Sequence, residues 1–343
     1  MRWLIVLIAA CATRTTATLP NWHAAPATGC QILPTTTAGT FRHRGNRAAH
    51  RLGEPRHRGL DLVTSESAER QVIAGELGYM AIDKAIEDED VEIFACEADH
   101  WRSLGATRSD RDGRVEIALT GSARLPAGLH SLYLAVAGDH RGVGFLAYVA
   151  PPHAATFVTD VDGTLTATEN GVVRSVLFKS DLDDQPGAPA ALRALAASGL
   201  QPIYLTARSH KYIELTRNWL ALHGYPRGPI LTSTHFARPG SGALTHKRHV
   251  LEALADLGIV PAIGIGNRAS DVQAYERLAH VFVKVPGYAD ELASLVAAGA
   301  AVEFTSYAEL PRLVDGALHC ATCASSTRSS NDSPSSPSIG SVH

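Results

Sequence analysis

The sequence predicts an α/β domain with a doubly wound parallel sheet over residues 151–318, preceded by a small antiparallel β-sandwich over residues 68–150. In the second domain, short apolar runs alternate with stretches of helical periodicity, which is typical of parallel strands joined by helices. In the first domain, short β-type runs are separated by turn residues. Polar side chains follow several apolar runs of the second domain, where α/β proteins collect their ligands.

The whole-chain composition is compatible with two globular domains. The chain has 343 residues, of which 45% are hydrophobic, so it can bury sizeable cores. Its formal net charge is only −3. We therefore expect no nucleic-acid partner, because such proteins carry a strong basic excess.

The N-terminus predicts an export signal within residues 1–20. A charged start, Met1-Arg2, precedes the apolar run 3–10, and Ile8-Ala9-Ala10-Cys11 resembles a bacterial lipoprotein signal in which Cys11 is lipidated. Ordinary cleavage further along the chain and a buried strand are the alternatives. We expect an exported protein, periplasmic or membrane-anchored, and a cytoplasmic one if the apolar run is a strand.

The segments flanking the two domains are predicted to be disordered. Residues 21–67 are rich in Thr, Ala, Pro, Arg and His, and their Arg-rich part, 42–58, reads as a solvated linker. The alternative is a polybasic arm that attaches the protein to anionic lipid. Residues 319–343 read as a Ser-rich tail, where a disulfide or metal role for Cys320 and Cys323 is the less favoured interpretation.

The β-sandwich is predicted to be of the immunoglobulin-like kind. Asp110-Arg111-Asp112-Gly113 is typical of a hairpin turn, since the other ligands of a calcium loop are absent. Cys96 is predicted to be a packed side chain without a special role. The candidate strands are 72–77, 91–94, 115–119, 132–136 and 143–149.

Helices of the second domain are predicted from capping residues and periodicity. One spans Pro189 to Ser198, and others follow the capping residues Ser209, Thr245 and Ser270. Lys247 is expected in the first turn of the helix that Thr245 caps. Only about forty residues separate the polar groups at 160 and 206, so little chain remains for a folded domain covering the site.

The stretch 157–166, Phe-Val-Thr-Asp-Val-Asp-Gly-Thr-Leu-Thr, carries the central chemistry. A buried strand is followed by two carboxylates, Asp160 and Asp162, which would repel each other unless a cation lay between them. Mg²⁺ suits this arrangement, because it binds through one or two carboxylates together with substrate phosphate. Gly163 and Thr164 can supply backbone N–H groups to an anion. An Asx-rich surface turn is the alternative.

Three later segments place further polar groups at strand ends or helix starts. The strand 201–206 ends at Thr206, and the strand 263–266 is followed by Asn267 and Asp271. Between them stands Lys247, with its neighbour Arg248 as a rival for the same role.

This order of motifs resembles the haloacid dehalogenase superfamily. The segments 160–166, 204–208, 228–231 and 266–271 look like the catalytic domain of lipin-type phosphatidate phosphatases. The resemblance implies a HAD-like fold and phosphomonoester hydrolysis, with Asp160 as nucleophile and Asp162 as general acid and base. It implies that Thr206 holds a phosphoryl oxygen and that Lys247 neutralises the phosphate and Asp160.

The resemblance also implies a Mg²⁺ site and a substrate site. Its metal ligands would be Asp160, the backbone carbonyl of Asp162, Asn267 and Asp271. Arg208 and Arg268 would bind the second charge of the substrate or pair with aspartates. The substrate-binding set is completed by Gly163, Thr164 and Ala207.

The sequence thus leads to the hypothesis of a Mg²⁺-dependent phosphatase, acting on a phosphorylated lipid such as phosphatidate. Two alternatives remain open. One is a phosphatase for small soluble or nucleotide phosphomonoesters. The other is a module that binds phosphatidate without hydrolysing it, although a pure binder has no need for the repelling pair Asp160 and Asp162. A membrane surface, reached through a lipidated Cys11 and the segment 42–58, is the expected further partner.

Overall fold

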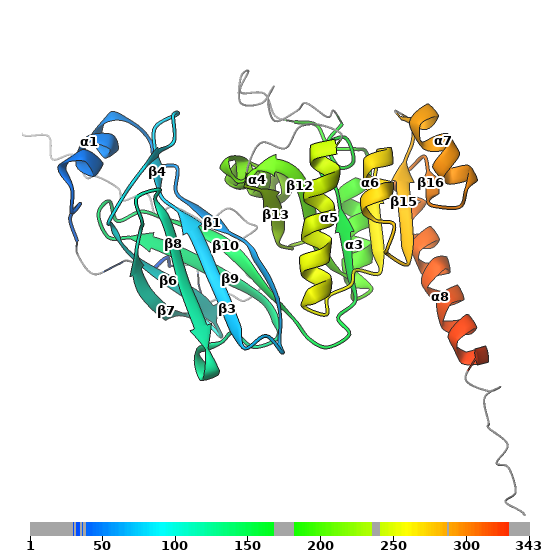
Figure 1. Ribbon diagram of the computed structural model, residues 1–343, viewed down its shortest axis with the longest axis horizontal. Coiled ribbons are helices and arrows are strands. Elements are labelled where there is room, and N and C mark those ends of the chain that lie inside the picture. Colours follow the sequence, from blue (N-terminus) through cyan, green and yellow to red (C-terminus); the bar gives the residue numbers. More distant parts are fainter. Residues whose placement is uncertain are drawn as a thin grey trace, which may run out of the picture.

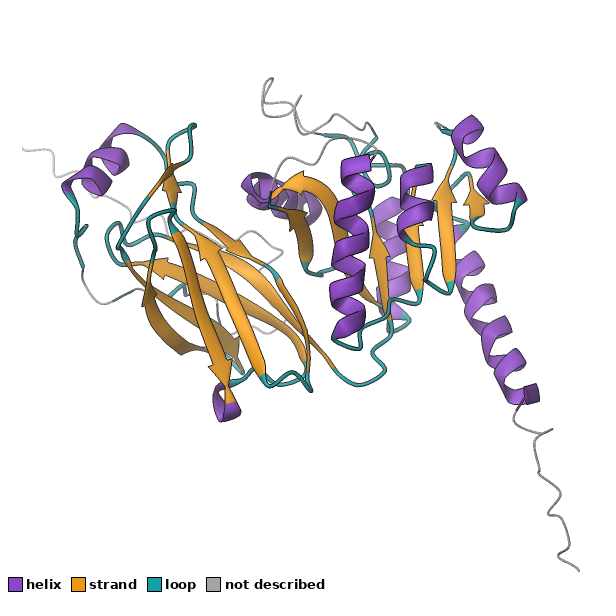
Figure 2. Cartoon of the chain, viewed as in Figure 1, coloured by secondary structure: helices purple, strands orange, loops and turns teal. Residues whose placement is uncertain are grey.

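The computed structural model of the chain describes residues 30, 32–34, 36, 39–167, 182–234, 241–286 and 288–328. These residues form the predicted β-sandwich and the predicted α/β domain, which lie side by side (Figures 1 and 2). The expected export signal and Cys11 lie outside the described residues. Within the described ranges, no helix is both long enough and apolar enough to cross a bilayer.

The first domain is built from a three-stranded and a five-stranded sheet. Their neighbouring strands are antiparallel, except that β2 and β10 run parallel. Ile73, Leu134 and Phe145 are completely buried between the sheets. All of the strands predicted here are present, in β3, β6, β8, β9 and β10. In order, the three-stranded sheet contains β1 (Arg58–Leu60), β3 (Arg70–Glu76) and β8 (Arg114–Thr120), and the five-stranded sheet contains β2 (Leu62–Ser65), β10 (Gly142–Ala150), β9 (Gly128–Val136), β6 (Asp90–Glu97) and β7 (His100–Arg108).

The prediction of a disordered linker over residues 21–67 is wrong for its second half. Helix α1 (Arg44–Leu52) and strands β1 and β2 belong to the sandwich domain. The basic composition suggested a solvated linker, because most of its charges are indeed exposed. The segment is nevertheless attached to the sandwich, through polar contacts whose partners lie further along the chain. Arg58, for example, is buried and pairs with Glu76 at 2.8 Å and with Asp83.

The segment 110–113 forms a turn but not the predicted hairpin. The Asp110 N–H donates to the Arg114 carbonyl at 2.8 Å, and Gly113 adopts a φ of +76°, which favours glycine. The strands on either side, β7 and β8, belong to different sheets. The turn therefore carries the chain from one sheet to the other.

A disulfide between Cys30 and Cys96 corrects the prediction for Cys96. The two Cα atoms are 6.0 Å apart, and 66 positions separate the residues in the sequence. The bond ties the segment before α1 to strand β6. Cys30 lies in a segment predicted to be a linker, so nothing local in the sequence pairs the two cysteines.

The second domain has a six-stranded sheet whose neighbouring strands are all parallel. The chain moves from β11 outward through β12 to β13 and then returns to β14 on the other side of β11. The direction of winding therefore reverses at β11, which is where doubly wound sheets bind ligands. In order, the strands are β13 (Ile230–Ser233), β12 (Gln201–Ser209), β11 (Thr156–Thr159), β14 (Ile263–Gly266), β15 (His280–Lys284) and β16 (Val302–Phe304).

Helices cover both faces of this sheet. One buried cluster joins the sheet to α3 (Ala188–Ala197), α4 (Ile213–Leu222) and α8 (Leu310–Arg328) through residues such as Leu192, Leu220 and Leu310. The other joins it to α5 (Ser241–Asp256), α6 (Ala269–Ala274) and α7 (Ala289–Ala297). The fold class is therefore as predicted: a β-sandwich followed by a doubly wound parallel α/β domain.

Helix starts were predicted less well than strands. Ser209 caps the short 3-10 helix η2 (His210–Tyr212), whose Lys211 N–H it accepts, and α4 follows. Thr245 lies inside α5 and donates to the Ser241 carbonyl, so Lys247 lies beyond the first turn. Ser270 lies inside α6, whose capping residue is Arg268.

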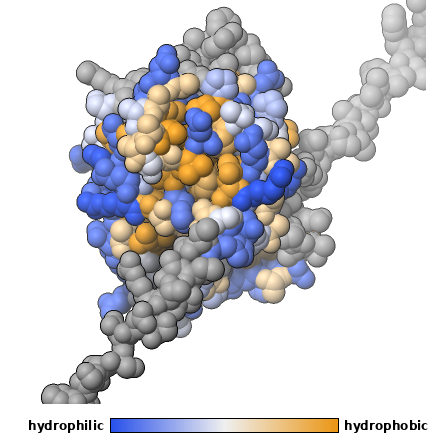
Figure 3. Space-filling model, turned by 90° about the vertical axis from the view of Figure 1, so that its right-hand side faces the viewer, coloured by the Kyte–Doolittle hydropathy of each residue, from blue (hydrophilic) through white to orange (hydrophobic). Residues whose placement is uncertain are grey.

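The C-terminal part of the domain extends further than predicted. Helix α8 runs to Arg328, so residues 319–328 are not a disordered tail. The side chains of Cys320 and Cys323 lie outside what the structure describes. Hydrophobic residues gather on the face at this end of the molecule (Figure 3). Val302, on the last strand of the sheet, is 49% exposed.

A buried ion pair joins the two domains. Asp61, between β1 and β2, accepts hydrogen bonds from Arg217 of α4 at 2.7 Å and from the Ile230 N–H of β13 at 2.8 Å. Both side chains are completely buried. Burial raises the pKa of the Asp61 carboxyl, and Arg217 partly offsets this rise. The charges stabilise the interface only as a pair, because either one alone would be desolvated without compensation.

Replacing Arg217 should therefore destabilise the protein strongly. Arg217→Met leaves the Asp61 carboxylate buried without its guanidinium, and we expect the free energy of unfolding to fall by about 3–5 kcal/mol. Urea denaturation followed by circular dichroism measures this change. The double variant Asp61→Asn/Arg217→Met should lose less free energy of unfolding than Arg217→Met alone, because no charged carboxylate is then left at position 61.

Arg248→Met is the matched control, because Arg248 makes an exposed ion pair with Glu276 at 3.0 Å. Such pairs contribute at most about 1 kcal/mol. If Arg217→Met costs no more than Arg248→Met, the buried pair does not hold the domains together.

Candidate functional site

Three neighbouring strands bring the predicted polar residues together. Asp160 directly follows β11, Thr206 lies in β12 where the pairing with β13 shifts register, and Asn267 directly follows β14. The Asp160 N–H donates to the Ile265 carbonyl at 3.0 Å, which fixes the end of β11 against β14. Sequence positions more than a hundred residues apart thus meet at one edge of the sheet.

The ammonium group of Lys247 lies between two buried carboxylates. Its Nζ donates to Asp160 Oδ1 at 2.5 Å and to Asp271 Oδ1 at 2.6 Å. Burial raises the pKa of Asp160, as do the nearby Asp271 and Asp162, while Lys247 opposes the rise. Burial lowers the pKa of Lys247, but the two carboxylates raise it well above its usual value. The lysine therefore stays charged and compensates the clustered acids.

Asp271 is held in place by backbone groups of the strand end. Its Oδ2 accepts the N–H groups of Asn267 at 3.0 Å and of Arg268 at 3.1 Å. A Cβ on Gly266 would lie 2.4 Å from the Asp271 Cβ, so the close approach requires glycine. Gly266 is thus required because the side chain of Asp271 lies directly against it.

Thr164 links the first and the last motif. Its Oγ1 is 3.1 Å from Asp160 Oδ2 and 3.0 Å from Asn267 Oδ1. Its carbonyl accepts the hydroxyl of Tyr307, a fully buried residue that the sequence did not indicate. Tyr307 belongs to no motif, and its partner is 143 positions away, so no local signal could have identified it.

Asp162 occupies the more exposed side of the site. Its side chain is 26% exposed and is held by Arg208, whose Nε and Nη2 donate to the carboxylate at 2.8–3.1 Å. Thr206 Oγ1 is 3.3 Å from Asp162 Oδ2. Arg208 is in turn oriented by Thr216 at 2.9 Å. Of the two roles expected for Arg208, the structure shows pairing with an aspartate.

Some of the predicted substrate contacts are used within the protein. The Gly163 N–H donates to Thr166 Oγ1 at 2.9 Å rather than being free for an anion, which corrects the prediction for that group. Arg268 donates to the Tyr288 hydroxyl at 2.8 Å, and its guanidinium lies 4.1 Å from the centre of the Tyr288 ring. Ala207 lies half-buried between Thr206 and Arg208.

The donor atoms at the site suit Mg²⁺. Asp160, the Asp162 carbonyl, Asn267 and Asp271 offer only oxygen, which is the ligand that this hard cation prefers. No cluster of three or more His, Cys, Asp or Glu side chains suited to a metal occurs in the described part of the chain. A magnesium ion here would thus rely on two carboxylates and complete its shell with water and phosphate oxygens, as it commonly does.

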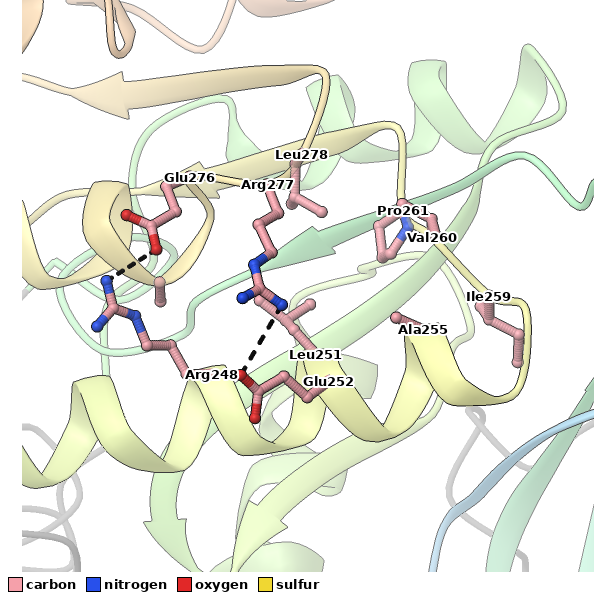
Figure 4. A pocket seen from close by; sticks show the side chains of 11 residues that line it. Arg248, Leu251, Glu252, Ala255, Ile259, Val260, Pro261, Glu276, Arg277 and Leu278 are labelled. Carbon is pink, nitrogen blue, oxygen red and sulfur yellow. Dashed lines mark hydrogen bonds and ion pairs between the residues drawn. The ribbon is translucent and has the colours of Figure 1, made fainter.

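A cavity lies elsewhere in the second domain (Figure 4). It has a volume of about 160 Å³ and lies between the C-terminal part of α5, the end of α6 and the segment before β14. Two ion pairs border it, Arg248 with Glu276 at 3.0 Å and Arg277 with Glu252 at 3.9 Å. Arg248 therefore lies outside the acidic cluster, and Lys247 alone of the two joins it. Residues 168–181, where any covering segment would lie, are outside the described residues.

Both domains match known protein families. Residues 55–149 match the family model described as the β-sandwich domain of PITM 1-3, and residues 157–282 match the LNS2 domain of PITM 1-3. The two matches cover separate parts of the chain and agree with the two domains of the structure. Residues 157–282 of the second domain are thus similar to LNS2 domains.

Curated relatives are long proteins of which this chain resembles a small part. It is 26% identical over 178 residues to Protein retinal degeneration B of Drosophila melanogaster, which covers 51% of this chain and 14% of that protein. It is 25% identical over 235 residues to Membrane-associated phosphatidylinositol transfer protein 2 of Mus musculus, covering 66% of this chain and 17% of that protein. The matched region thus spans less than a fifth of these relatives.

Solved structures with a similar second domain include two sugar phosphatases. D,D-heptose 1.7-bisphosphate phosphatase from B. bronchiseptica is 14% identical, with a TM-score of 0.37, and the match covers 47% of this chain and 97% of that one. Deoxy-D-mannose-octulosonate 8-phosphate phosphatase from Haemophilus influenzae is 17% identical, with a TM-score of 0.33, over 48% of this chain and 89% of that one. Scores this low support no argument about this chain.

The oxygen-only site leads to a prediction about metal binding that does not depend on activity. A ligand that binds only the folded protein at a concentration of 100 times its Kd adds about 2.7 kcal/mol of stability. Mg²⁺ should therefore raise the melting temperature of the protein, and Asp271→Asn should reduce or abolish this rise. Differential scanning calorimetry with and without Mg²⁺ measures both effects. Glu276→Gln, an exposed carboxylate outside the cluster, is the control and should keep the full rise; an unchanged rise in Asp271→Asn would exclude Asp271 as a ligand.

Proposed function

We propose that this chain is a Mg²⁺-dependent phosphomonoesterase that acts through an aspartyl-phosphate on Asp160 and takes a phosphorylated lipid, such as phosphatidate, as substrate. The single observation that carries the proposal is the cluster of Asp160, Lys247 and Asp271 at the strand ends, with Asp162 beside it on the exposed side. A nucleophilic carboxylate needs neighbouring positive charge to approach an anionic phosphate, and Lys247 supplies it.

The proposed reaction has two displacement steps at phosphorus. An oxygen of Asp160 forms a bond to phosphorus while the bond to the ester oxygen breaks, and Asp162 gives its proton to the leaving alkoxide. Asp162 then takes a proton from water, whose oxygen attacks the phosphorus and releases Asp160 and inorganic phosphate. The partial exposure of Asp162 fits this role, because the leaving group has to depart on the open side of the site.

Other residues position these groups. Lys247 neutralises Asp160 and the phosphoryl oxygens, and Thr206 donates a hydroxyl beside them. Arg208 is a positioning residue, since it orients Asp162 through the two-nitrogen contact. Mg²⁺, when bound by Asp160, Asp271, Asn267 and the Asp162 carbonyl, would supply additional positive charge to the phosphoryl oxygens.

A lipid substrate is supported by the kind of protein that this chain resembles. Several relatives bear the name of membrane-associated phosphatidylinositol transfer protein. Small soluble or nucleotide phosphomonoesters are the alternative substrates. Such substrates differ from a lipid only in the leaving group. The protein groups that would contact the phosphate are the same for both classes of substrate.

A non-catalytic phosphatidate-binding module is the second candidate function. It is favoured by the fact that both catalytic carboxylates are already paired, Asp160 with Lys247 and Asp162 with Arg208. A site made only to bind an anion has no use for Asp160 and Asp162, however, so we favour catalysis.

We also propose that the protein is exported. The disulfide between Cys30 and Cys96 supports this, because such bonds persist in oxidising compartments and are rare in the cytosol. Lipidation of Cys11 would then anchor the protein at a membrane, where its proposed substrate lies.

The catalytic proposal predicts distinct losses for the two aspartates. Asp160→Asn removes the nucleophile without changing its shape and should abolish phosphate release. Asp162→Asn should lower the rate of phosphate release by about 10²-fold or more, as expected of general acid–base catalysis. Release of inorganic phosphate from phosphatidate vesicles and from soluble phosphomonoesters, with Mg²⁺ or with EDTA, measures these effects.

Asp256→Asn serves as the control. This residue ends α5 near the amino ends of the parallel strands, away from the site, and its replacement should leave turnover unchanged. Near wild-type turnover by Asp160→Asn, or full turnover in EDTA, would refute the catalytic proposal. Vesicle binding that requires Mg²⁺ without any phosphate release would instead favour the binding module.

The export proposal predicts where the protein is found in cells. Full-length protein should appear in the membrane fraction, and Cys11→Ser should release it, because several acyl chains anchor a lipoprotein stably whereas a single chain does so only marginally. Cell fractionation followed by immunoblotting measures the distribution. Cys323→Ser, which leaves Cys11 intact, is the control. Recovery of the intact full-length protein from the cytoplasm would contradict export.

A further inference from the structure

One tip of the β-sandwich exposes two large aliphatic side chains to water. Leu52, the last residue of α1, is 75% exposed, and Ile82 is 76% exposed. Ile82 lies in the turn between the short strands β4 (Gly78–Tyr79) and β5 (Lys84–Ala85). Single exposed hydrophobic residues need no explanation, but two on one tip are worth explaining.

Contacts between the end of α1 and the β4–β5 hairpin join the two segments that carry these side chains. The Met80 N–H donates to the Glu54 carbonyl at 2.9 Å. Gly53 is packed against Met80 so closely that a Cβ on it would lie 2.5 Å from the Met80 Cγ. We call residues 51–56 and 80–84 the docking tip.

The surroundings of these aliphatic side chains are cationic. Arg51, Arg56 and Lys84 of the docking tip are exposed, and Arg44 and Arg47 are exposed further along α1. The exposed carboxylates nearby are Glu54, which lies 3.5 Å from Arg141, Glu87 just beyond β5, and Asp88, whose side chain is 43% exposed beside His43. Exposed cations thus outnumber exposed carboxylates around the tip.

An ion pair connects the docking tip to the segment that follows Arg208. Asp83 of the tip lies 3.6 Å from the ammonium of Lys211 in η2. Lys211 follows closely after Arg208, which holds Asp162. In Figure 1, α1 and β4 lie toward the top of the view, which is also where the carboxyl ends of the parallel strands point. A surface that touches the tip would therefore lie on the same side of the molecule as the candidate site.

We propose that the docking tip binds the surface of an anionic lipid bilayer, with Leu52 and Ile82 entering the interface and the surrounding Arg and Lys side chains facing the head groups. This pairing of apolar side chains with cations is the combination that peripheral membrane proteins use. The inference rests on the proposed lipid substrate and deepens it, because it states how the site reaches a head group that stays in the membrane.

The test measures binding separately from turnover. Two proteins are each sedimented with vesicles of phosphatidylcholine that contain phosphatidate. One carries Asp160→Asn alone, and the other carries Asp160→Asn together with Leu52→Glu/Ile82→Glu. The added changes should weaken binding at least tenfold, because they place carboxylates against an anionic surface. Val260→Glu is the matched control: Val260 is 58% exposed but lies before β14, at the opposite edge of the sheet, and its replacement should have no effect.

Activity measurements with otherwise wild-type protein complete the test. Leu52→Glu/Ile82→Glu should lower phosphate release from vesicles at least tenfold and leave release from a soluble phosphomonoester within twofold. Replacing Arg51, Arg56 and Lys84 by Gln should make vesicle binding weaker and less sensitive to salt.

The outcomes separate this inference from the proposed function. Vesicle binding and vesicle turnover that are unchanged in Leu52→Glu/Ile82→Glu would overturn the docking tip while leaving the phosphatase intact. Binding that depends on the tip, without any phosphate release by otherwise wild-type protein, would support the tip and refute the phosphatase. If Val260→Glu weakens vesicle binding as much as Leu52→Glu/Ile82→Glu does, the docking tip is also refuted, because the effect would then come from the added negative charge alone.

Discussion

The ion pairs of Lys247 are the interaction on which the candidate site depends. Asp160 and Asp271 are brought together by two neighbouring strands, and without a cation between them they would repel each other in a buried place. The lysine comes from α5, on a different element from either acid, so the cluster also fixes that helix against the strand ends. The same positive charge that stabilises the fold is the one that an incoming phosphate requires. Stability and the proposed chemistry therefore share one side chain.

The β-sandwich contributes to the site from outside it. Asp61 holds α4 and β13 through Arg217 and the Ile230 backbone, while Glu76 lies 3.3 Å from His210 and Asp83 lies 3.6 Å from Lys211 in the 3-10 helix after β12. These contacts surround the segment that carries Thr206 and Arg208. The sandwich thus both supports the wall of the site and presents the exposed tip beside it, which gives the domain a role that its sequence alone did not suggest.

The sequence predicted what is local and missed what depends on distant partners. Asp160 and Asn267 directly follow apolar runs, and Asp162 and Asp271 come shortly after them, so their place near strand ends could be predicted from order and spacing. The β-sandwich boundary was placed too late, because Arg58 and Asp61 are charged, and charged residues resemble linker until their buried partners are known. Asp61 pairs with a residue 156 positions away, and Cys30 pairs with one 66 positions away. Helix starts were also predicted wrongly: Ser270 and Thr245 are good capping residues, but α6 is capped by Arg268 and α5 begins at Ser241.

The central claim is that Asp160 becomes phosphorylated during turnover. The most direct measurement is to mix the protein with phosphatidate vesicles and Mg²⁺, stop the reaction with acid within the first turnovers, and analyse the peptides by mass spectrometry. The account predicts a phosphoryl group on the peptide that contains Asp160, at the Asp160 side chain, and its absence when Mg²⁺ is removed. Phosphate release that proceeds without any modification of Asp160, or with the modification on another residue, would contradict it.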